Sequence, residues 1–319
     1  MKRKWLRLVK VVFVFEVGIF VLVSPVRATY IPHRELNFDS GNLGEWRDGG
    51  HCCSYSTQVV TSPVRNGEYA VRAEVRDGDI PQPNTMGGNE RSEIMLNGPN
   101  NQDKIPYSTD VWQGFSVYID PSYQPNGSYR FNIIAQWHTS TGGHSPILSL
   151  QYIYGGDFYI GIRSKEGPSR DIKIGTPEKG KWYDFIFNTR FDYHLPGSGY
   201  VRVWMNGSRV LNYSGPVGYD YDIGPYLKMG IYRNKDIYSA TQIVYHDEYR
   251  RGTSCEEVNP NRGGSPCPTG RSSPVPTPTP TPSPPNFKNL LLNWLTSTGD
   301  RNGDGKVNAI DFVKLATGK

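Results

Sequence analysis

The sequence predicts an all-β protein, an antiparallel β-sandwich or jelly roll of concanavalin-like type, followed by a linker and a small helical segment with a calcium loop. The stretch from Tyr30 to about Arg271 is rich in Tyr, Val, Ile, Phe and Gly, and its short alternating runs are separated by turn residues. Helical periodicity of any length is absent there, which favours antiparallel sheets. The 319 residues suffice for one large β domain plus a small second unit.

The first 28 residues are typical of a secretory signal peptide, with a basic start, an apolar run and a small-x-small ending at Ala28. The run is too short to predict a transmembrane helix, so we expect a secreted, extracellular protein without a membrane segment after cleavage. The predicted segments are a signal peptide (1–28), a β-jelly-roll domain (29–271), a Pro/Thr-rich linker (272–285) and a dockerin-like calcium-binding segment (286–319).

The charge of the predicted β domain is close to neutral. The signal segment holds six basic residues and one acid, which accounts for the formal net charge of +5 of the whole chain. From Tyr30 to Arg271, 24 Lys and Arg stand against 26 Asp and Glu, a net charge of −2. This balance argues against electrostatic binding of nucleic acid and makes a highly sulfated polyanion a poor match.

Several runs predict individual strands because apolar and polar residues alternate and turn residues bound each run. They are Tyr69–Val75, Val111–Ile119 and Trp182–Phe191, together with a hairpin over Tyr200–Tyr213. Asn206-Gly207 is the expected two-residue turn of that hairpin.

The four cysteines predict disulfides, since the chain is expected to meet an oxidising compartment. Cys255 and Cys267 bracket a Gly/Pro-rich loop and are expected to pair. A bridge between the adjacent Cys52 and Cys53 would be strained, and three pairings are formally possible. No cysteine has CxxC spacing, so we expect structural bridges rather than a zinc or redox site.

The residues that follow the proline-rich linker predict a calcium loop. An apolar segment of helical length, Asn286–Thr298, leads directly into the loop, and Gly305 supplies the sharp turn at its sixth position. The expected Ca²⁺ ligands are Asp300, Asn302, Asp304, the Lys306 carbonyl, Asn308 and Asp311. Asp at position 12 and the run "VNAIDF" resemble the repeat of cellulosomal dockerins. That resemblance implies two repeats docking onto a cohesin; one repeat is found, which a calcium-stabilised cap or a partial docking tag would also explain.

Three predicted strands present polar side chains beside an apolar stripe, because side chains on a strand alternate between two faces. In "FNIIAQWH", alternation predicts one face of Phe131, Ile133, Ala135 and Trp137 and another of Asn132, Ile134, Gln136 and His138. In "YLKMGIY", it separates Tyr226, Lys228, Gly230 and Tyr232 from Leu227, Met229 and Ile231. In "ERSEIML", it places Arg91 and Glu93 opposite Ser92, Ile94 and Leu96.

These polar faces fit β-elimination on a uronic acid polymer. Removing the C5 proton places negative charge on the neighbouring carboxylate, so the site must neutralise that group. Arg91, Gln136 and Lys228 suit this role. A base takes the C5 proton and an acid protonates the departing O4, and His138 and Tyr232 suit these two roles.

The stretches "RSE", "QWH" and "YLKMGIY" resemble the motifs of jelly-roll polysaccharide lyases of the heparin lyase I and glucuronan lyase type, and more remotely alginate lyases. The likeness extends from about Phe38 through Tyr249 and implies a substrate groove on a concave sheet. It implies the following roles: Arg91 and Gln136 neutralise the carboxylate, His138 is the base, Tyr232 is the acid or, for one epimer, also the base, and Lys228 holds substrate. Met95, where alginate lyases carry a second Arg, and Arg233-Asn234, where they carry Asn-Gln, argue against alginate. The likeness also implies a structural calcium site at Asp247 and Glu248.

The remaining candidates for substrate binding lie beside these motifs or in Gly-rich loops: Tyr226, Glu93, Arg233, His51 and His144. We expect an acidic polysaccharide as the partner, and the near-neutral domain favours a glucuronan-like chain. A local basic patch of Arg91, Arg130, Lys228, Arg233 and Lys235 would instead favour heparin or heparan sulfate. Two alternatives stay open: a carbohydrate-binding module without catalysis, and a glycoside hydrolase, which would need two carboxylates flanking the scissile bond.

Overall fold

The computed structural model describes residues 30–81, 88–125, 130–141, 144–220, 223–235, 240–261 and Cys267. The chain divides into two compact units, Met1–Cys267 and Pro268–Lys319, and all described residues belong to the first. The predicted signal peptide, linker and calcium-loop segment lie outside the described residues. Within the described ranges, no helix has the length and apolar character needed to cross a membrane.

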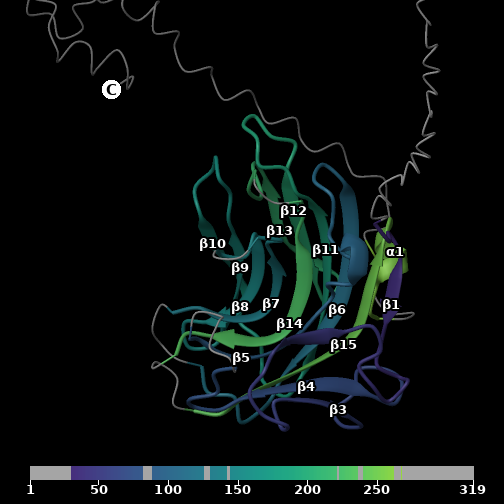
Figure 1. The fold of residues 1–319 in the computed structure, drawn as a ribbon, viewed down its shortest axis with the longest axis vertical. Helices are drawn as coiled ribbons and strands as arrows, with labels where there is room; N and C mark the ends of the chain where they lie inside the picture. Colours follow the sequence, from purple (N-terminus) through teal and green to yellow (C-terminus); the bar gives the residue numbers. More distant parts are fainter. Residues whose placement is uncertain are drawn as a thin grey trace, which may run out of the picture. The chain divides into compact units, whose positions relative to one another are not determined.

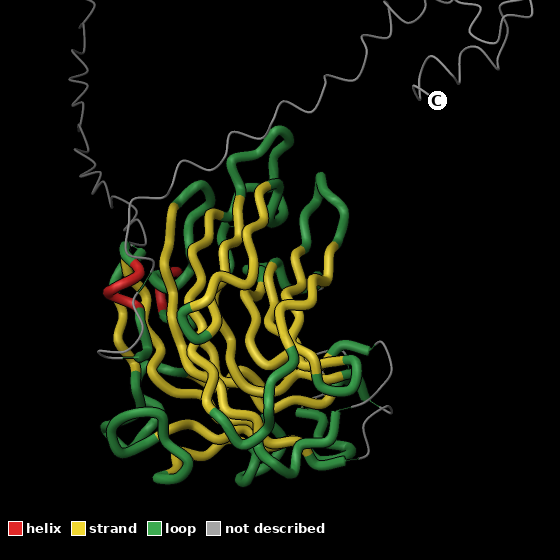
Figure 2. The backbone as a smooth tube through the Cα atoms, turned by 180° about the vertical axis from the view of Figure 1, so that it is seen from behind, coloured by secondary structure: helices red, strands yellow, loops and turns green. Residues whose placement is uncertain are grey.

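Two antiparallel sheets make up this unit, which confirms the all-β sandwich (Figure 1). The eight-stranded sheet has the order β13 (Ser208–Ser214), β12 (Tyr200–Met205), β11 (Trp182–Arg190), β6 (Asp110–Ile119), β15 (Gln242–Gly252), β4 (Ala70–Val75) and β3 (Thr57–Val60), with β1 (Arg34–Leu36) paired to β15. The seven-stranded sheet has the order β10 (Arg170–Gly175), β9 (Asp157–Ile162), β8 (Leu148–Ile153), β7 (Asn132–His138), β14 (Tyr226–Arg233), β5 (Glu90–Met95) and β2 (Arg47–Gly50). Helical structure among the described residues is limited to η1 (Pro99–Asn101) and α1 (Cys255–Val258), the short red segments of Figure 2.

The core lies between the two sheets because every second residue of the inner strands is apolar. Trp137 of β7 packs against Phe187 of β11 with 4.6 Å between ring centroids, and Phe187 stacks on Phe115 of β6. The indole N–H of Trp137 donates to Gln113 Oε1 over 2.6 Å, so the one polar atom of this ring is satisfied. The strongly curved β14 in Figure 1 contributes Leu227, Met229 and Ile231 to this core, as alternation predicts.

The alternation predicted for β7 is only half right. Ile134 and Ala135 are consecutive, yet both belong to the core, and the register with β8 shifts between Ile133 and Ala135. Such a β-bulge inserts one residue and reverses the faces on either side of it. Gln136 and His138 therefore keep the predicted outer face, whereas Phe131, which packs on Tyr232 of β14, lies on the face opposite to the predicted one.

The predicted hairpin and one predicted disulfide are observed. Asn206 and Gly207 have φ of 49° and 80° and connect β12 to β13, the geometry that a tight two-residue turn requires. Cys255 pairs with Cys267. Cys52 pairs with Cys53, so the structure selects the pairing of adjacent cysteines from the three possibilities.

Candidate active site

A buried ion-pair cluster connects three neighbouring strands on the outer face of the seven-stranded sheet. Glu93 of β5 accepts from Lys228 Nζ of β14 over 2.6 Å and from the side-chain amide of Gln136 of β7. Arg91 NH1 lies 3.6 Å from the same carboxylate, and Lys228 also donates to the Gly49 carbonyl over 2.8 Å. Two cations around one carboxylate give the ion-paired cluster a formal charge of +1.

The cluster forms because β14 lies between β5 and β7. The cross-strand register places Lys228 opposite Gln136 on one side and opposite Met95 on the other, so Glu93 is within reach of Lys228. None of Arg91, Glu93, Gln136 and Lys228 is more than 5% exposed. Burial lowers the pKa of Lys228, and the charge of Glu93 opposes that shift. The four predicted residues are therefore brought together, but as a layer beneath the surface rather than as freely accessible contacts.

His138 lies two residues beyond Gln136 in β7. It is on the same face as Gln136 and is half-buried. Its Nδ1 is 2.7 Å from the Thr139 carbonyl oxygen, which can only accept, so Nδ1 carries the proton and Nε2 keeps its lone pair. Burial, followed by the nearby Lys228 charge, lowers the pKa of His138. The imidazole is therefore neutral at neutral pH and able to accept a proton.

The structure brings His138 together with Tyr226 rather than with Tyr232. Tyr226 pairs with His138 across β7 and β14, and their ring centroids are 5.4 Å apart. Tyr232 is six residues further along β14, about 20 Å along a strand. It stacks under Arg91 with 4.1 Å between the guanidinium carbon and the ring centroid, and its hydroxyl accepts from Asn89 Nδ2 over 3.1 Å. The predicted pairing of His138 with Tyr232 is thus not observed.

Two of the predicted substrate-binding residues are buried. Arg233 is fully buried and pairs with Glu90, because it has the same strand parity as the core residues of β14. Burial raises the pKa of Glu90, against the effects of the Gly78 amide and Arg233. Lys228 is also internal and uses its ammonium on Glu93 and Gly49. Neither side chain is placed to hold a sugar directly.

The two loop histidines lie at different places. His51 follows β2, and its Nδ1 is 2.8 Å from Asp48 Oδ1. It is close in sequence to Gly49, whose carbonyl binds Lys228, so this loop borders the buried cluster. His144 is exposed in the loop after β7, with its ring 5.8 Å from that of Tyr219.

Sequence reasoning missed a polar row on β8 to β10. Ser149 and Gln151, each 4% exposed, alternate with Leu148, Leu150 and Tyr152 on β8, and Asp171 lies on β10. Alternation in "LSLQY" would have identified the two β8 residues, because a polar residue at every second position is the pattern that marked Gln136. Asp171 could not have been assigned to this row, because its place depends on the order of the strands in the sheet, which the sequence does not reveal.

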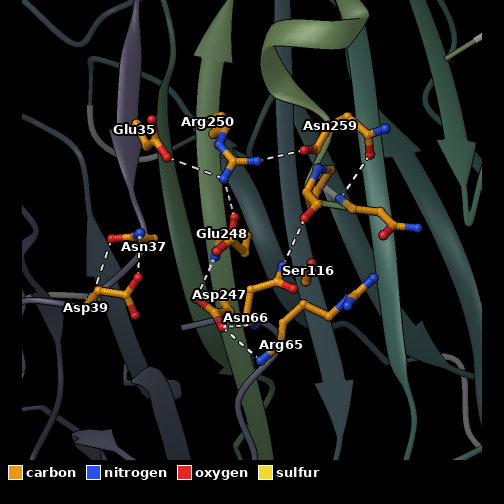
Figure 3. A network of polar contacts seen from close by, with 12 residues as sticks. Glu35, Asn37, Asp39, Arg65, Asn66, Ser116, Asp247, Glu248, Arg250 and Asn259 are labelled. Atoms are coloured by element: carbon orange, nitrogen blue, oxygen red, sulfur yellow. Dashed lines mark hydrogen bonds and ion pairs between the residues drawn. The ribbon is translucent and has the colours of Figure 1, made fainter. Parts of the chain in front are cut away.

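The residues expected to hold a structural calcium ion lie on the other sheet, in β15 (Figure 3). Asp247 is buried and accepts from the backbone amides of Arg65 and Glu248 over 2.9 and 2.7 Å. Burial raises the pKa of its carboxyl to about 7. Glu248 pairs with Arg250, which also donates to the Asn259 carbonyl. The fit to a calcium ion is therefore partial: Asp247 offers a carboxylate that its surroundings do not fully compensate, whereas Glu248 already has a cation.

Comparison with known proteins identifies the family. A family model described as polysaccharide lyase matches residues 38–250, two thirds of the chain and nearly the extent of the resemblance found in the sequence. The chain belongs to this polysaccharide lyase family. The lyase is similar in fold to an endo-β-1,4-glucuronan lyase from the fungus Trichoderma reesei, with a TM-score of 0.56, 17% identity, and coverage of 73% of this chain and 100% of that one.

Two further solved structures align less closely with the lyase. They are the cellulose induced protein Cip1 (TM-score 0.47, 13% identity, 69% of this chain and 97% of that one) and the alginate lyase AlgAT5 from polysaccharide lyase family 7 (TM-score 0.44, 14% identity, 63% and 83%). No curated protein matches the chain. Of these three structures, the glucuronan lyase is the one whose TM-score exceeds 0.5, and it alone supports the fold.

Proposed function

We propose that this lyase cleaves an unsulfated, glucuronan-like polyuronate by β-elimination, with His138 as the base. The observation that carries the proposal is the state of His138: a neutral imidazole whose Nε2 lone pair is left available by the Nδ1 hydrogen bond to Thr139. It lies two residues from Gln136, about 7 Å along β7, and thus beside a buried cluster of net positive charge. A proton acceptor beside a cationic layer suits a reaction that abstracts a proton next to a carboxylate.

The proposed step transfers the C5 proton of the uronate to His138 Nε2. Charge that builds up on the uronate carboxylate is stabilised by the cluster of Arg91, Lys228 and Glu93 and by the Gln136 amide. These groups act at short range through protein of low dielectric constant and need no reorganisation. The bond between C4 and O4 then breaks with formation of the C4–C5 double bond, and a tyrosine protonates the leaving O4. Tyr226 fits this role better than Tyr232, because it lies beside His138.

The preference for an unsulfated chain follows from how the basic residues are paired. Of the residues that would make a basic patch, Arg91 and Lys228 share Glu93, and Arg233 pairs with Glu90 in the interior. Of the five, Arg130 and Lys235 are exposed, and two accessible cations are few beside the dense array that heparin would need. The lyase of similar fold acts, by its name, on a β-1,4-glucuronan.

Secretion, a calcium ion in the 300–311 loop, and a cohesin-type partner remain part of the proposal. They rest on the sequence patterns of residues 1–28 and 286–319, which lie outside the described residues. The expectation for a calcium ion in the lyase domain rests on Asp247.

The test offers the purified mature protein glucuronan, alginate, heparin, heparan sulfate and pectate, and follows the ultraviolet absorbance of the C4–C5 unsaturated product. We expect a rise with glucuronan and little or none with heparin. His138→Ala should fold, since the residue faces outward, and should lower turnover by about 10²–10⁴-fold. A flat trace on every polymer, with binding still seen by affinity electrophoresis, would favour the carbohydrate-binding module. A rise in reducing ends without the chromophore would favour a hydrolase.

A further inference from the structure

A single row of cross-strand partners extends from the buried cluster to the far edge of the seven-stranded sheet. Gln136 of β7 lies opposite Ser149 of β8, Ser149 lies opposite Gly161 of β9, and Gly161 lies opposite Asp171 of β10. Residues directly opposite one another in a sheet share a face. Ser149, Gly161 and Asp171 therefore lie on the outer face that carries Gln136 and His138.

Polar atoms of three side chains lie close together above Gly161. A Cβ atom at this position would lie 2.5 Å from Ser149 Oγ, 2.6 Å from Gln151 Nε2 and 2.9 Å from Asp171 Oδ1. The backbone of Gly161 is not among the left-handed conformations that favour glycine. Glycine at this position thus leaves room for the three side chains gathered above it, and the backbone conformation does not demand it.

Hydrogen bonds hold the side chains of Asp171 and Gln151 in place. Arg163 binds the Asp171 carboxylate through NH2 at 2.9 and 3.1 Å, and Gln151 Nε2 donates to Asp171 Oδ1 over 2.9 Å. Within the described ranges, Ser149 Oγ and Gln151 Oε1 make no hydrogen bond, and both residues are only 4% exposed, so they form the floor of the sheet face. An amide oxygen, a carboxylate and a hydroxyl offer mainly acceptors, so a ligand here must bring donors.

We propose that Ser149, Gln151 and Asp171, arranged over Gly161, form a distal subsite that binds the hydroxyl groups of an unsulfated sugar unit in the same polysaccharide chain. The site lies two strands from Gln136, about 10 Å across the sheet, so it receives a different unit from the one that reacts. A sulfate or carboxylate group has acceptors only, and it would face the Asp171 carboxylate, whose guanidinium partner is already engaged in two hydrogen bonds. The inference rests on the proposed function and deepens it, because it gives the site a preference for hydroxyl-bearing chains.

Gly161→Ala tests the subsite by placing a methyl group where the three polar atoms converge. The fold should survive, because those atoms are side-chain ends that can turn away. We expect KM for long glucuronan chains to rise about tenfold, the equivalent of one or two hydrogen bonds, with kcat nearly unchanged. The rise should disappear with the shortest oligosaccharide that is still cleaved, because such a chain does not reach β9.

Gly175→Ala is the matched control. It lies on β10, its backbone is likewise outside the left-handed region, and a Cβ there would approach only the terminal methyl of Met205, at 2.9 Å. This variant should retain the wild-type KM. If Gly161→Ala fails to fold, Ser149→Ala decides the question, since it removes the hydroxyl without adding bulk and should raise KM about fivefold.

An unchanged KM in folded Gly161→Ala, or a KM that rises equally for short and long chains, would overturn the subsite. Affinity electrophoresis on glucuronan separates this failure from that of the reaction. Wild-type protein that binds glucuronan without forming the unsaturated product would refute the elimination, and weaker binding by Gly161→Ala would still support the subsite. Wild-type protein that forms the product, with Gly161→Ala indistinguishable from it, would refute the subsite alone.

Discussion

Glu93→Gln should be the most destabilising single change in the candidate site. Glu93 is 2% exposed and is the common partner of Lys228, Arg91 and Gln136. The substitution keeps the shape of the side chain but leaves the Lys228 ammonium buried without a carboxylate. Removing one partner of a buried ion pair costs about 3–5 kcal/mol, a large part of the stability of a typical domain. Urea unfolding at neutral pH, monitored by tryptophan fluorescence, measures the loss.

The pH dependence of this loss gives a second check on the same reasoning. Burial already lowers the pKa of Lys228 in the folded protein, and removing Glu93 should lower it further. The unfolded chain keeps the lysine protonated up to about pH 10.4, so the folded variant is penalised below that value. The penalty is full below the lowered pKa of the folded variant and shrinks as the pH rises from there to the unfolded value of about 10.4. The difference between wild type and variant should therefore narrow in alkaline buffer.

Two controls isolate the buried pair. Glu178→Gln breaks the pair with Lys181, whose side chains are 72% and 58% exposed, and should not change stability measurably. Glu93→Gln combined with Lys228→Met removes both charges and should recover a substantial part of the loss. A cost below about 1 kcal/mol for Glu93→Gln, or a double variant no more stable than the single one, would show that the cluster is not a buried ion-pair network.

Three further outcomes are expected. The acidic limb of the pH profile of kcat/KM should lie below the ordinary histidine pKa of 6.5, because the pKa of His138 is lowered and the base must be neutral; a limb above that value would contradict the assignment. Tyr226→Phe should lower kcat by about 10²-fold or more while Tyr232→Phe lowers it less, and the reverse order would restore Tyr232 as the acid. In EDTA, thermal stability should fall as the pH rises from about 4 through about 7, because the Asp247 pKa is raised to about 7 and its charged form is disfavoured in the fold. Millimolar calcium should offset that fall, and an unchanged slope in Asp247→Asn would remove Asp247 as its cause.

Local periodicity was enough to predict the architecture and much of the site. Gln136 and His138 on one strand, and Arg91 and Glu93 on another, lie on the outer face because the intervening apolar residues are drawn into the core. The same rule would have excluded Arg233, which has the parity of Ile231 and is buried with it. The prediction included Arg233 because it is charged, without regard to the face of the strand that it occupies.

Partnerships between strands could not be predicted from the sequence, because register is a property of the assembled sheet. Tyr226 and Tyr232 share a face by alternation, and nothing local distinguishes which of them meets His138. The cation cluster was foreseen as a set of accessible donors, whereas the structure makes Glu93 its centre. A carboxylate at that place is explained only when Lys228 and Gln136 are known to lie side by side.

The bulge in β7 explains why the proposed reaction centre is confined to one end of the strand. Upstream of the register shift the outer face carries Ile133, opposite Tyr232; downstream of it the outer face carries Gln136 and His138, opposite Lys228 and Tyr226. An unbulged strand with the upstream half fixed would have turned Gln136 and His138 toward the core, where neither could serve a substrate. The extra residue between Ile133 and Ala135 therefore lets one strand anchor apolar packing at one end and present a proton acceptor at the other. Tyr226 lies directly opposite His138, whereas Tyr232 lies six residues further along β14, and this is the structural reason for proposing Tyr226 as the acid.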